Sequence, residues 1–145
     1  MLIDDDDADV ELTLYALRKN KLVNHIQVLR DGEEAVDYLF GPGRDLRSDW
    51  GRMPKLILLD LKLPKIDGIE VLRRIKGDHV TRSIPVVILT SSNEERDLVM
   101  GYKLGVNSYI QKPVDFDKFR EVVMQVGLYW LVINQPAPVL SELAV

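Results

Sequence analysis

The stretch that most constrains the fold is a run of four apolar residues, 56–59, that leads directly into Asp60. An uninterrupted apolar run of this length is typical of a strand buried on both faces, as in a parallel sheet. Pro64 cannot donate a backbone hydrogen bond to a neighbouring strand, so the strand ends before it. Asp60 is therefore expected at the carboxyl edge of a sheet, where open α/β sheets bind ligands. An aspartate at this point could also be a helix cap or a turn residue.

Short apolar stretches alternate with amphipathic ones along the whole chain. The apolar stretches predict five strands, at residues 1–3, 25–29, 56–59, 86–90 and 108–111. Apolar residues at helical spacing predict five helices, at residues 9–20, 31–40, 69–76 and 94–104 and after Asp115. This alternation predicts an α/β fold with parallel strands, right-handed crossovers and helices on both faces of the sheet. The side chains expected to cap the first, fourth and last helices are Asp6 or Asp7, Asn93 and Asp115.

The composition excludes several classes of protein. At 145 residues the chain has the size of one domain. Its net charge of −4 argues against direct binding to nucleic acid, which usually needs a basic surface. The absence of cysteine excludes disulfides and thiolate metal sites. We expect a cytoplasmic protein, because the apolar stretch at 122–133 is too short to span a bilayer and no signal peptide precedes the aspartates at 4–7.

Polar side chains stand where four of the expected strands end: Asp4 and Asp5, Asp60, Thr90 and Lys112. If the strands are parallel, these side chains meet at one edge of the sheet. Carboxylates held close together repel one another unless a cation joins them, and an oxygen-only donor set favours a hard ion such as Mg²⁺. A hydroxyl and an ammonium beside one carboxylate suit phosphoryl transfer, in which the carboxylate itself can be the nucleophile.

These residues resemble the receiver domain of two-component response regulators. The resemblance rests on the acidic pair Asp4 and Asp5, on Asp60 followed by Pro64, on Thr90, and on Lys112 followed by proline. It extends over residues 1–128, and residues 129–145 are expected to form an extension of the last helix and a tail. It implies a flavodoxin-like, doubly wound (βα)5 fold with the strand order 2-1-3-4-5.

The resemblance also implies the roles of the acidic residues. Asp60 would be the phosphoacceptor, taking a phosphoryl group from a phosphohistidine of a sensor histidine kinase. Asp5 would bind Mg²⁺ directly, and Asp4 would bind it through a water molecule. The backbone carbonyl of Lys62 would supply a further ligand. The Lys62 side chain, two residues after the acceptor, would either contact the phosphoryl group or block water.

The remaining roles concern phosphate binding and the switch. Lys112 would contact a phosphate oxygen, and its peptide bond to Pro113 would be cis. Thr90 would bond to the phosphoryl group, and Ser91 stands where the family has a small residue that allows access. Tyr109 matches an aromatic residue that turns inward as Thr90 moves, although it could also be an ordinary half-buried strand residue.

Softer features resemble the small regulators paired with bacterial phytochrome kinases: the long segment at 41–53 and the apolar segment that begins at Tyr129. No DNA-binding domain is expected, so the output would be a protein contact. Apolar residues surround the helix end at 129–133, which suggests either that it folds back onto its own domain or that it packs against a second copy. We predict a homodimer with a sensor kinase as partner, and no nucleic-acid or membrane contact.

Three other functions share parts of this pattern. An aspartyl-nucleophile phosphatase normally needs a second aspartate where Lys62 stands. A flavin-binding module would need a phosphate loop after the first strand, where the aspartates would repel the phosphate. A pseudo-receiver that only binds partners would keep the fold. Because a response regulator catalyses only its own phosphorylation and dephosphorylation, we do not expect an enzyme that turns over a separate substrate.

Overall fold

The computed structural model of the chain describes residues 1–22, 25–42 and 53–137. Its five strands are all parallel and lie in the order β2-β1-β3-β4-β5, which confirms the predicted fold. The strands are β1 (Leu2–Ile3), β2 (Val28–Leu29), β3 (Ile57–Leu59), β4 (Val86–Thr90) and β5 (Ser108–Gln111). The helices are α1 (Asp7–Lys19), α2 (Gly32–Phe40), α3 (Gly68–Gly77), α4 (Glu95–Lys103) and α5 (Phe116–Gly127), and a π-helical turn, η2 (Leu128–Ile133), continues α5.

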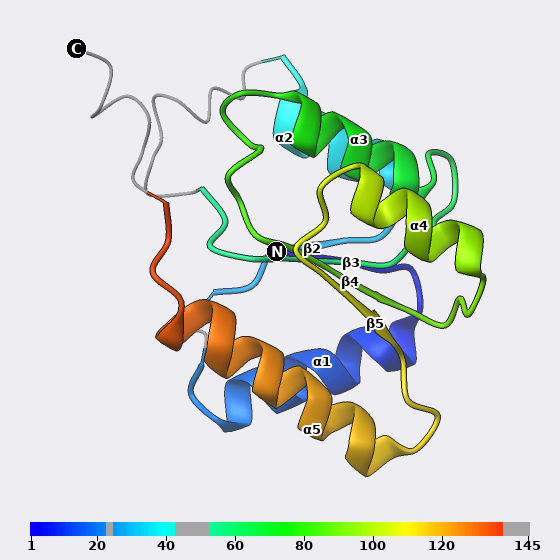
Figure 1. The fold of residues 1–145 in the computed structure, drawn as a ribbon. Coiled ribbons are helices and arrows are strands. Elements are labelled where there is room, and N and C mark those ends of the chain that lie inside the picture. The colour runs from blue at the N-terminus through cyan, green and yellow to red at the C-terminus, as the bar shows by residue number, and fades with distance from the viewer. Residues whose placement is uncertain (23–24, 43–52, 138–145) are drawn as a thin grey trace.

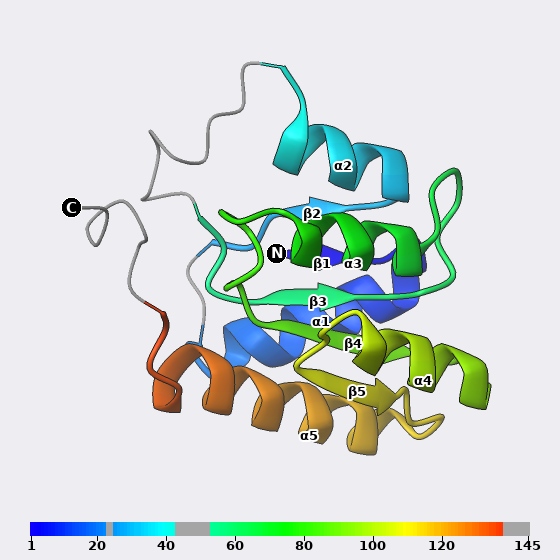
Figure 2. The same cartoon turned by 45° about the horizontal axis from the view of Figure 1, so that its top comes forward.

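The helices form two layers around the sheet (Figures 1 and 2). Helices α1 and α5 pack side by side on one face, and α2, α3 and α4 cover the other. Alternate residues of β3 point to the two helix layers. Ile57 and Leu59 pack in the core cluster between the sheet and helices α2, α3 and α4, called the α2–α4 cluster below. Leu58 packs in the cluster between the sheet and the helix pair α1 and α5, called the α1–α5 cluster below. All three residues are buried, as the uninterrupted apolar run predicted.

Aspartates cap four of the helices by accepting hydrogen bonds from backbone N–H groups of the first turn. Asp6 caps α1 and Asp115 caps α5, as predicted, and Asp31 and Asp67 cap α2 and α3. The prediction for α4 is wrong, because Glu94 occupies the cap position of α4 and its side chain makes no capping bond.

The extension after α5 combines packed and exposed apolar side chains. Trp130 and Leu131 pack against the α1–α5 cluster. Leu128, Tyr129, Val132 and Ile133 remain between 45% and 61% exposed. Most of the long segment predicted at 41–53, and the tail from residue 138 onward, lie outside the described residues. Within the described part of the chain, no helix has the length and hydrophobicity needed to cross a membrane.

Candidate functional site

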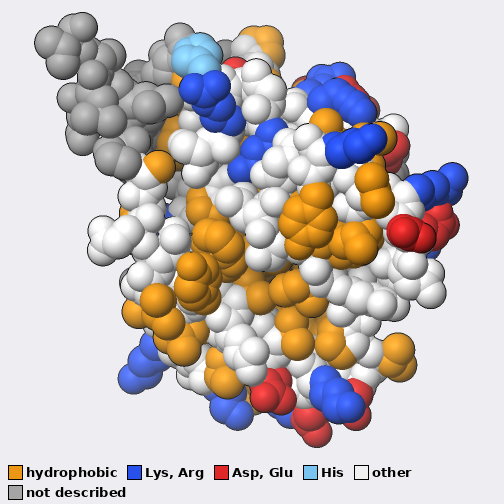
Figure 3. All heavy atoms as spheres, viewed as in Figure 1, with side chains coloured by type: hydrophobic (Ala, Val, Ile, Leu, Met, Phe, Trp, Pro, Cys, Tyr) orange, Lys and Arg blue, Asp and Glu red, His pale blue; other side chains and the backbone are white. Residues whose placement is uncertain are grey.

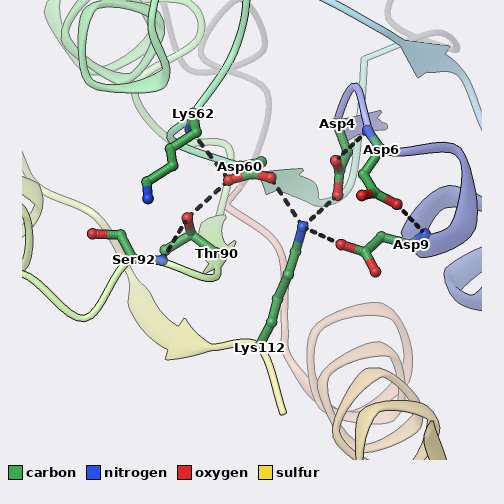
Figure 4. A network of polar contacts seen from close by, with 8 residues as sticks. All are labelled: Asp4, Asp6, Asp9, Asp60, Lys62, Thr90, Ser92 and Lys112. Carbon is green, nitrogen blue, oxygen red and sulfur yellow. Dashed lines mark hydrogen bonds and ion pairs between the residues drawn. The ribbon is translucent and has the colours of Figure 1, made fainter. Parts of the chain in front are cut away.

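The predicted site residues meet at the carboxyl edge of the sheet, around Asp60 (Figure 4). The hydroxyl of Thr90 donates a hydrogen bond to Oδ1 of Asp60 at 2.8 Å. The ammonium of Lys112 donates to Oδ2 of the same carboxylate at 2.9 Å. Both partners are almost fully buried, as Asp60 itself is. The strand ends therefore place a hydroxyl and a cation on opposite oxygens of one carboxylate.

Backbone pairing explains why these side chains converge. The N–H of Asp60 donates to the carbonyl of Ile3 at 2.9 Å, which holds the end of β3 beside the start of the acidic run. The N–H of Lys112 donates to the carbonyl of Thr90 at 2.7 Å. Adjacent parallel strands therefore carry their terminal residues to one edge of the sheet.

Gly68 allows α3 to begin against the end of β3. A Cβ at Gly68 would lie 2.3 Å from the carbonyl oxygen of Asp60, too close for any side chain. The N–H of Gly68 donates to the carbonyl of Leu61 at 2.9 Å, which fixes this close approach. This hydrogen bond fixes the loop between Asp60 and α3 close to the backbone of Asp60.

Three carboxylates form a group that could hold a metal ion. One oxygen each from Asp4, Asp5 and Asp60 lies within 4.8 Å of the other two. Asp4 and Asp60 are buried, whereas Asp5 is exposed. An all-carboxylate donor set with one open side fits a hard divalent cation that keeps part of its water shell. The structure therefore brings the three predicted acidic residues together.

Lys112 lies at the centre of a buried charge cluster. Its ammonium bonds to Asp4 at 2.9 Å, Asp9 at 2.8 Å and Asp60 at 2.9 Å. Burial raises the pKa of Asp4 to about 6, although the hydrogen bond from Lys112 acts to lower it. Burial would lower the pKa of Lys112, but the hydrogen bonds to Asp9 and Asp4 outweigh this effect and raise it. Lys112 is therefore a fixed positive charge at physiological pH.

The other oxygen of Asp60 is connected to the loop between β4 and α4. The N–H of Ser92 donates to Oγ1 of Thr90 at 3.3 Å, and the Ser92 hydroxyl donates to Asp97 at 2.6 Å. The hydroxyl of Tyr109 donates to the carbonyl of Ser92 at 3.4 Å. Tyr109 is half-buried, so its ring lies on the edge of the α2–α4 cluster. A chain of contacts thus runs from Asp60 to Tyr109.

The structure places the remaining predicted residues less centrally. The backbone N–H of Lys62 donates to Oδ1 of Asp60 at 3.2 Å. The Lys62 side chain is exposed and extends on the Thr90 side of Asp60, away from Lys112 (Figure 4). Ser91 is exposed at the end of β4. The prediction of a cis bond before Pro113 is wrong, because no peptide bond among the described residues is cis. Cis and trans X–Pro bonds differ little in energy, so sequence alone does not decide between them.

Two residues that contribute contacts to the site, Asp9 and Asp97, were not predicted from the sequence. Asp9 lies in the first turn of α1 and reaches Lys112, and Asp97 lies in α4 and holds Ser92. An acidic residue in the first turn of a helix is ordinarily explained by the helix dipole, so neither residue stood out. The signal that could have found Asp9 is its place on a helix that starts directly after the acidic pair.

Comparison with known proteins agrees with this geometry. Residues 1–124 match the response regulator receiver domain family. The chain belongs to this family. Such receiver domains act mainly as phosphoacceptors in two-component signalling, and the placement of Asp60 is consistent with that role.

Relatives similar to this receiver over nearly their full length are small regulators. The probable methanogenesis regulatory protein FilR2 of Methanothrix harundinacea is 41% identical over 95% of this chain and 87% of its own. Response regulator Rcp1 of Synechocystis sp. is 37% identical over 94% of this chain and 92% of its own. The crystal structure of Mn²⁺-bound Rcp1 has a TM-score of 0.84 at 35% identity, covering 94% of this chain and 96% of Rcp1.

A third relative is described as a phosphorylated cyanobacterial phytochrome response regulator, RcpA. Its structure has a TM-score of 0.83 at 37% identity and covers 93% of this chain and 94% of RcpA. The receiver described here is therefore homologous to single-domain response regulators of phytochrome signalling.

Proposed function

We propose that this receiver accepts a phosphoryl group on Asp60 from a sensor histidine kinase, in a reaction that depends on Mg²⁺. The observation that carries the proposal is the set of contacts around one buried carboxylate. Thr90 and Lys112 bind its two oxygens, and Asp4 and Asp5 stand within 4.8 Å of it. These groups provide the positioning and charge neutralisation on which phosphoryl transfer depends.

In the transfer step an oxygen of Asp60 attacks the phosphorus of a phosphohistidine. The P–N bond breaks, the histidine leaves with its electron pair, and an acyl phosphate forms on Asp60. Lys112 neutralises the charge that the phosphoryl oxygens bring, and the Thr90 hydroxyl turns to one of them. Hydrolysis of the acyl phosphate by water then returns Asp60 to its carboxylate. The protein thus catalyses its own phosphorylation and dephosphorylation and is not an enzyme that acts on a separate substrate.

The proposed cation site uses residues that the chain supplies at this edge. Asp5, Asp60 and the carbonyl of Lys62 would hold Mg²⁺ directly, and Asp4 would hold it through a water molecule. When bound, the cation supplies positive charge that offsets the repulsion among the carboxylates and the phosphoryl group. The Mn²⁺-bound structure of the relative Rcp1 supports a divalent cation in this family.

The proposed output is a change of shape between β4 and α5. A phosphoryl group adds close to two negative charges and new acceptor oxygens, which draw the Thr90 hydroxyl toward them and away from Oδ1 of Asp60. Movement of Thr90 disturbs the Ser92 loop, and the Tyr109 ring takes up the space that Thr90 leaves. Ser91, at the mouth of the pocket, leaves room for the incoming group. In this switch the phosphoryl group shifts the population of the protein from one conformation to a second one.

The experiment that tests the acceptor role is phosphorylation by acetyl phosphate with Mg²⁺, followed by intact-mass measurement. We expect a gain of one phosphoryl group in the wild-type chain and none in Asp60→Asn. A matched control is Asp37→Asn, an exposed aspartate of α2 outside the site, which should be labelled like the wild type. No labelling of the wild type would make this a partner-binding pseudo-receiver, and equal labelling of the Asp60→Asn chain would place the acceptor at another residue.

We further propose that the partner is a phytochrome-type kinase and that the protein is cytoplasmic. We propose that it forms a homodimer, with a receiver at 1–128 and a dimerising extension at 129–145. Figure 3 shows hydrophobic side chains gathered on the face that carries α4, β5 and α5. The extension adds exposed apolar groups to the end of α5, including Val132 at 61% and Ile133 at 60% exposure. A solvated helix end would not carry them, which favours an isologous contact with a second copy.

Light scattering on the full chain tests the dimer. The double change of Val132 and Ile133 to aspartate should yield a monomer, because it places charge in the proposed contact. The control is Asp37→Lys, a charge change at an exposed residue of α2, outside the face that carries α4, β5 and α5, and this variant should remain dimeric. A double variant that remains dimeric would remove the extension from the interface.

A further inference from the structure

All three N–H donors of the Lys112 ammonium bond to carboxylates. An ammonium carries three protons and no acceptor. Its three bonds go to Asp4 at 2.9 Å, Asp9 at 2.8 Å and Asp60 at 2.9 Å. No proton of Lys112 is therefore free to meet a phosphoryl oxygen, and one of the three carboxylates must give way when the phosphoryl group arrives.

The three carboxylates differ in how easily they can give way. Asp60 carries the phosphoryl group itself, so its Oδ2 stays beside Lys112. The Asp4 side chain is 4% exposed and also accepts the N–H of Asp6 at 3.0 Å. The Asp9 side chain is 29% exposed, so water can replace Lys112 as its partner. Asp9 also stands outside the carboxylate group that could hold a metal.

We infer that Asp9 is a positioning residue that holds the Lys112 ammonium while Asp60 is free and competes with the phosphoryl group for it. The inference rests on the proposed acceptor role of Asp60. Asp9 is well fixed for this purpose, because its N–H donates to the cap residue Asp6 at 2.9 Å and α1 begins there. Its carboxylate also faces the negative charge of the arriving group across the same ammonium, which raises the cost of the phosphorylated state.

The opposite role makes the opposite prediction. If Asp9 only held Lys112 in place for the phosphoryl group, removing its charge would weaken binding of that group. If Asp9 competes, removing its charge weakens its bond to the Lys112 ammonium and so strengthens binding of the phosphoryl group. The direction of the change therefore separates competition from simple support.

The test uses beryllofluoride, a phosphoryl analogue that coordinates a carboxylate oxygen, titrated into the full chain with Mg²⁺ and followed by fluorine NMR. We expect Asp9→Asn to lower the dissociation constant about tenfold, the factor for a hydrogen bond to a charged group. Asp9→Glu, which keeps the charge, should stay within about twofold of the wild type. The matched control is Asp7→Asn, in the same helical turn but paired with Arg30, which should also stay within about twofold.

Asp9→Ser provides a second neutral variant in case the first folds poorly, and thermal unfolding confirms the fold of each. Tighter binding in every neutral variant that folds, with Asp7→Asn unchanged, supports the inference. Binding that is unchanged or weaker in a folded neutral variant overturns it, and so does an equal gain in Asp7→Asn. Failure of the wild-type chain to bind beryllofluoride would instead contradict the proposed acceptor role of Asp60.

Discussion

The two oxygens of Asp60 face very different surroundings. Oδ2 faces the Lys112 side, where one ammonium contacts three carboxylates and the lysine side chain is only 7% exposed to solvent. Oδ1 faces the Thr90 side, where a neutral hydroxyl and the backbone N–H of Lys62 are its donors. Both sides bind the same carboxylate, but only the first carries a large electrostatic cost.

This difference separates two tasks within one pocket. The Lys112 side sets how much free energy it costs to bring a cation or a phosphoryl group to Asp60, because its charges are not balanced without them. The Thr90 side connects Asp60 to Ser92 and Tyr109 through hydrogen bonds of neutral groups. We therefore expect substitutions on the Lys112 side to change stability and metal dependence most, and substitutions on the Thr90 side to change phosphoryl recognition.

The largest expected effect follows loss of the lysine charge. Lys112→Met leaves three neighbouring carboxylates without a cation and should lower the free energy of unfolding by about 3–5 kcal/mol at pH 7. Urea unfolding in metal-free buffer measures this loss, and added Mg²⁺ should restore part of it. The comparison variant is Lys62→Met, on the Thr90 side, where the exposed side chain should change stability by less than about 0.5 kcal/mol. Similar losses in both variants would contradict the contrast between the two sides.

A second effect concerns the pH dependence of the Lys112 side. Burial raises the pKa of Asp4 from 3.8 to about 6. Between these values the folded chain binds more protons at Asp4 than the unfolded chain does, so its stability falls as the pH rises. Asp4→Asn removes this titration. The free energy of unfolding of this variant, relative to the wild type, should therefore increase by about 2–3 kcal/mol between pH 4 and pH 7.

Urea unfolding across this pH range in metal-free buffer measures that difference. The control is Thr13→Val, a change at a buried residue of α1 that carries no titratable group, so its effect on stability should not depend on pH. A difference between Asp4→Asn and wild type that stays constant from pH 4 to pH 7 would show that Asp4 is ionised throughout.

Sequence reasoning reached the fold and the centre of the site because both depend on strong local patterns. The apolar runs at β3 and β4 fixed two central strands, and parallel pairing then brought Asp60, Thr90 and Lys112 to one edge. It extended the weakly apolar β2 too far, since only Val28 and Leu29 pair. The contact between Asp9 and Lys112 was not predicted, because it depends on where α1 starts relative to the sheet. The spacing of residues along the sequence does not give that distance.

The smallest expected loss of stability comes from a substitution on the Thr90 side of Asp60. Thr90→Val keeps the shape of a fully buried side chain but removes the donor to Asp60 and should cost about 1–2 kcal/mol of unfolding free energy. Thr81→Val is a matched control, because Thr81 is equally buried and its hydroxyl donates to the carbonyl of Ile75 at 2.7 Å, outside the site. The two losses of stability should be similar. Affinity for beryllofluoride, however, should fall in Thr90→Val alone, because only that hydroxyl faces the acceptor oxygen. An equal fall in both variants would mean that the hydroxyl of Thr90 supports the fold and does not recognise the phosphoryl group.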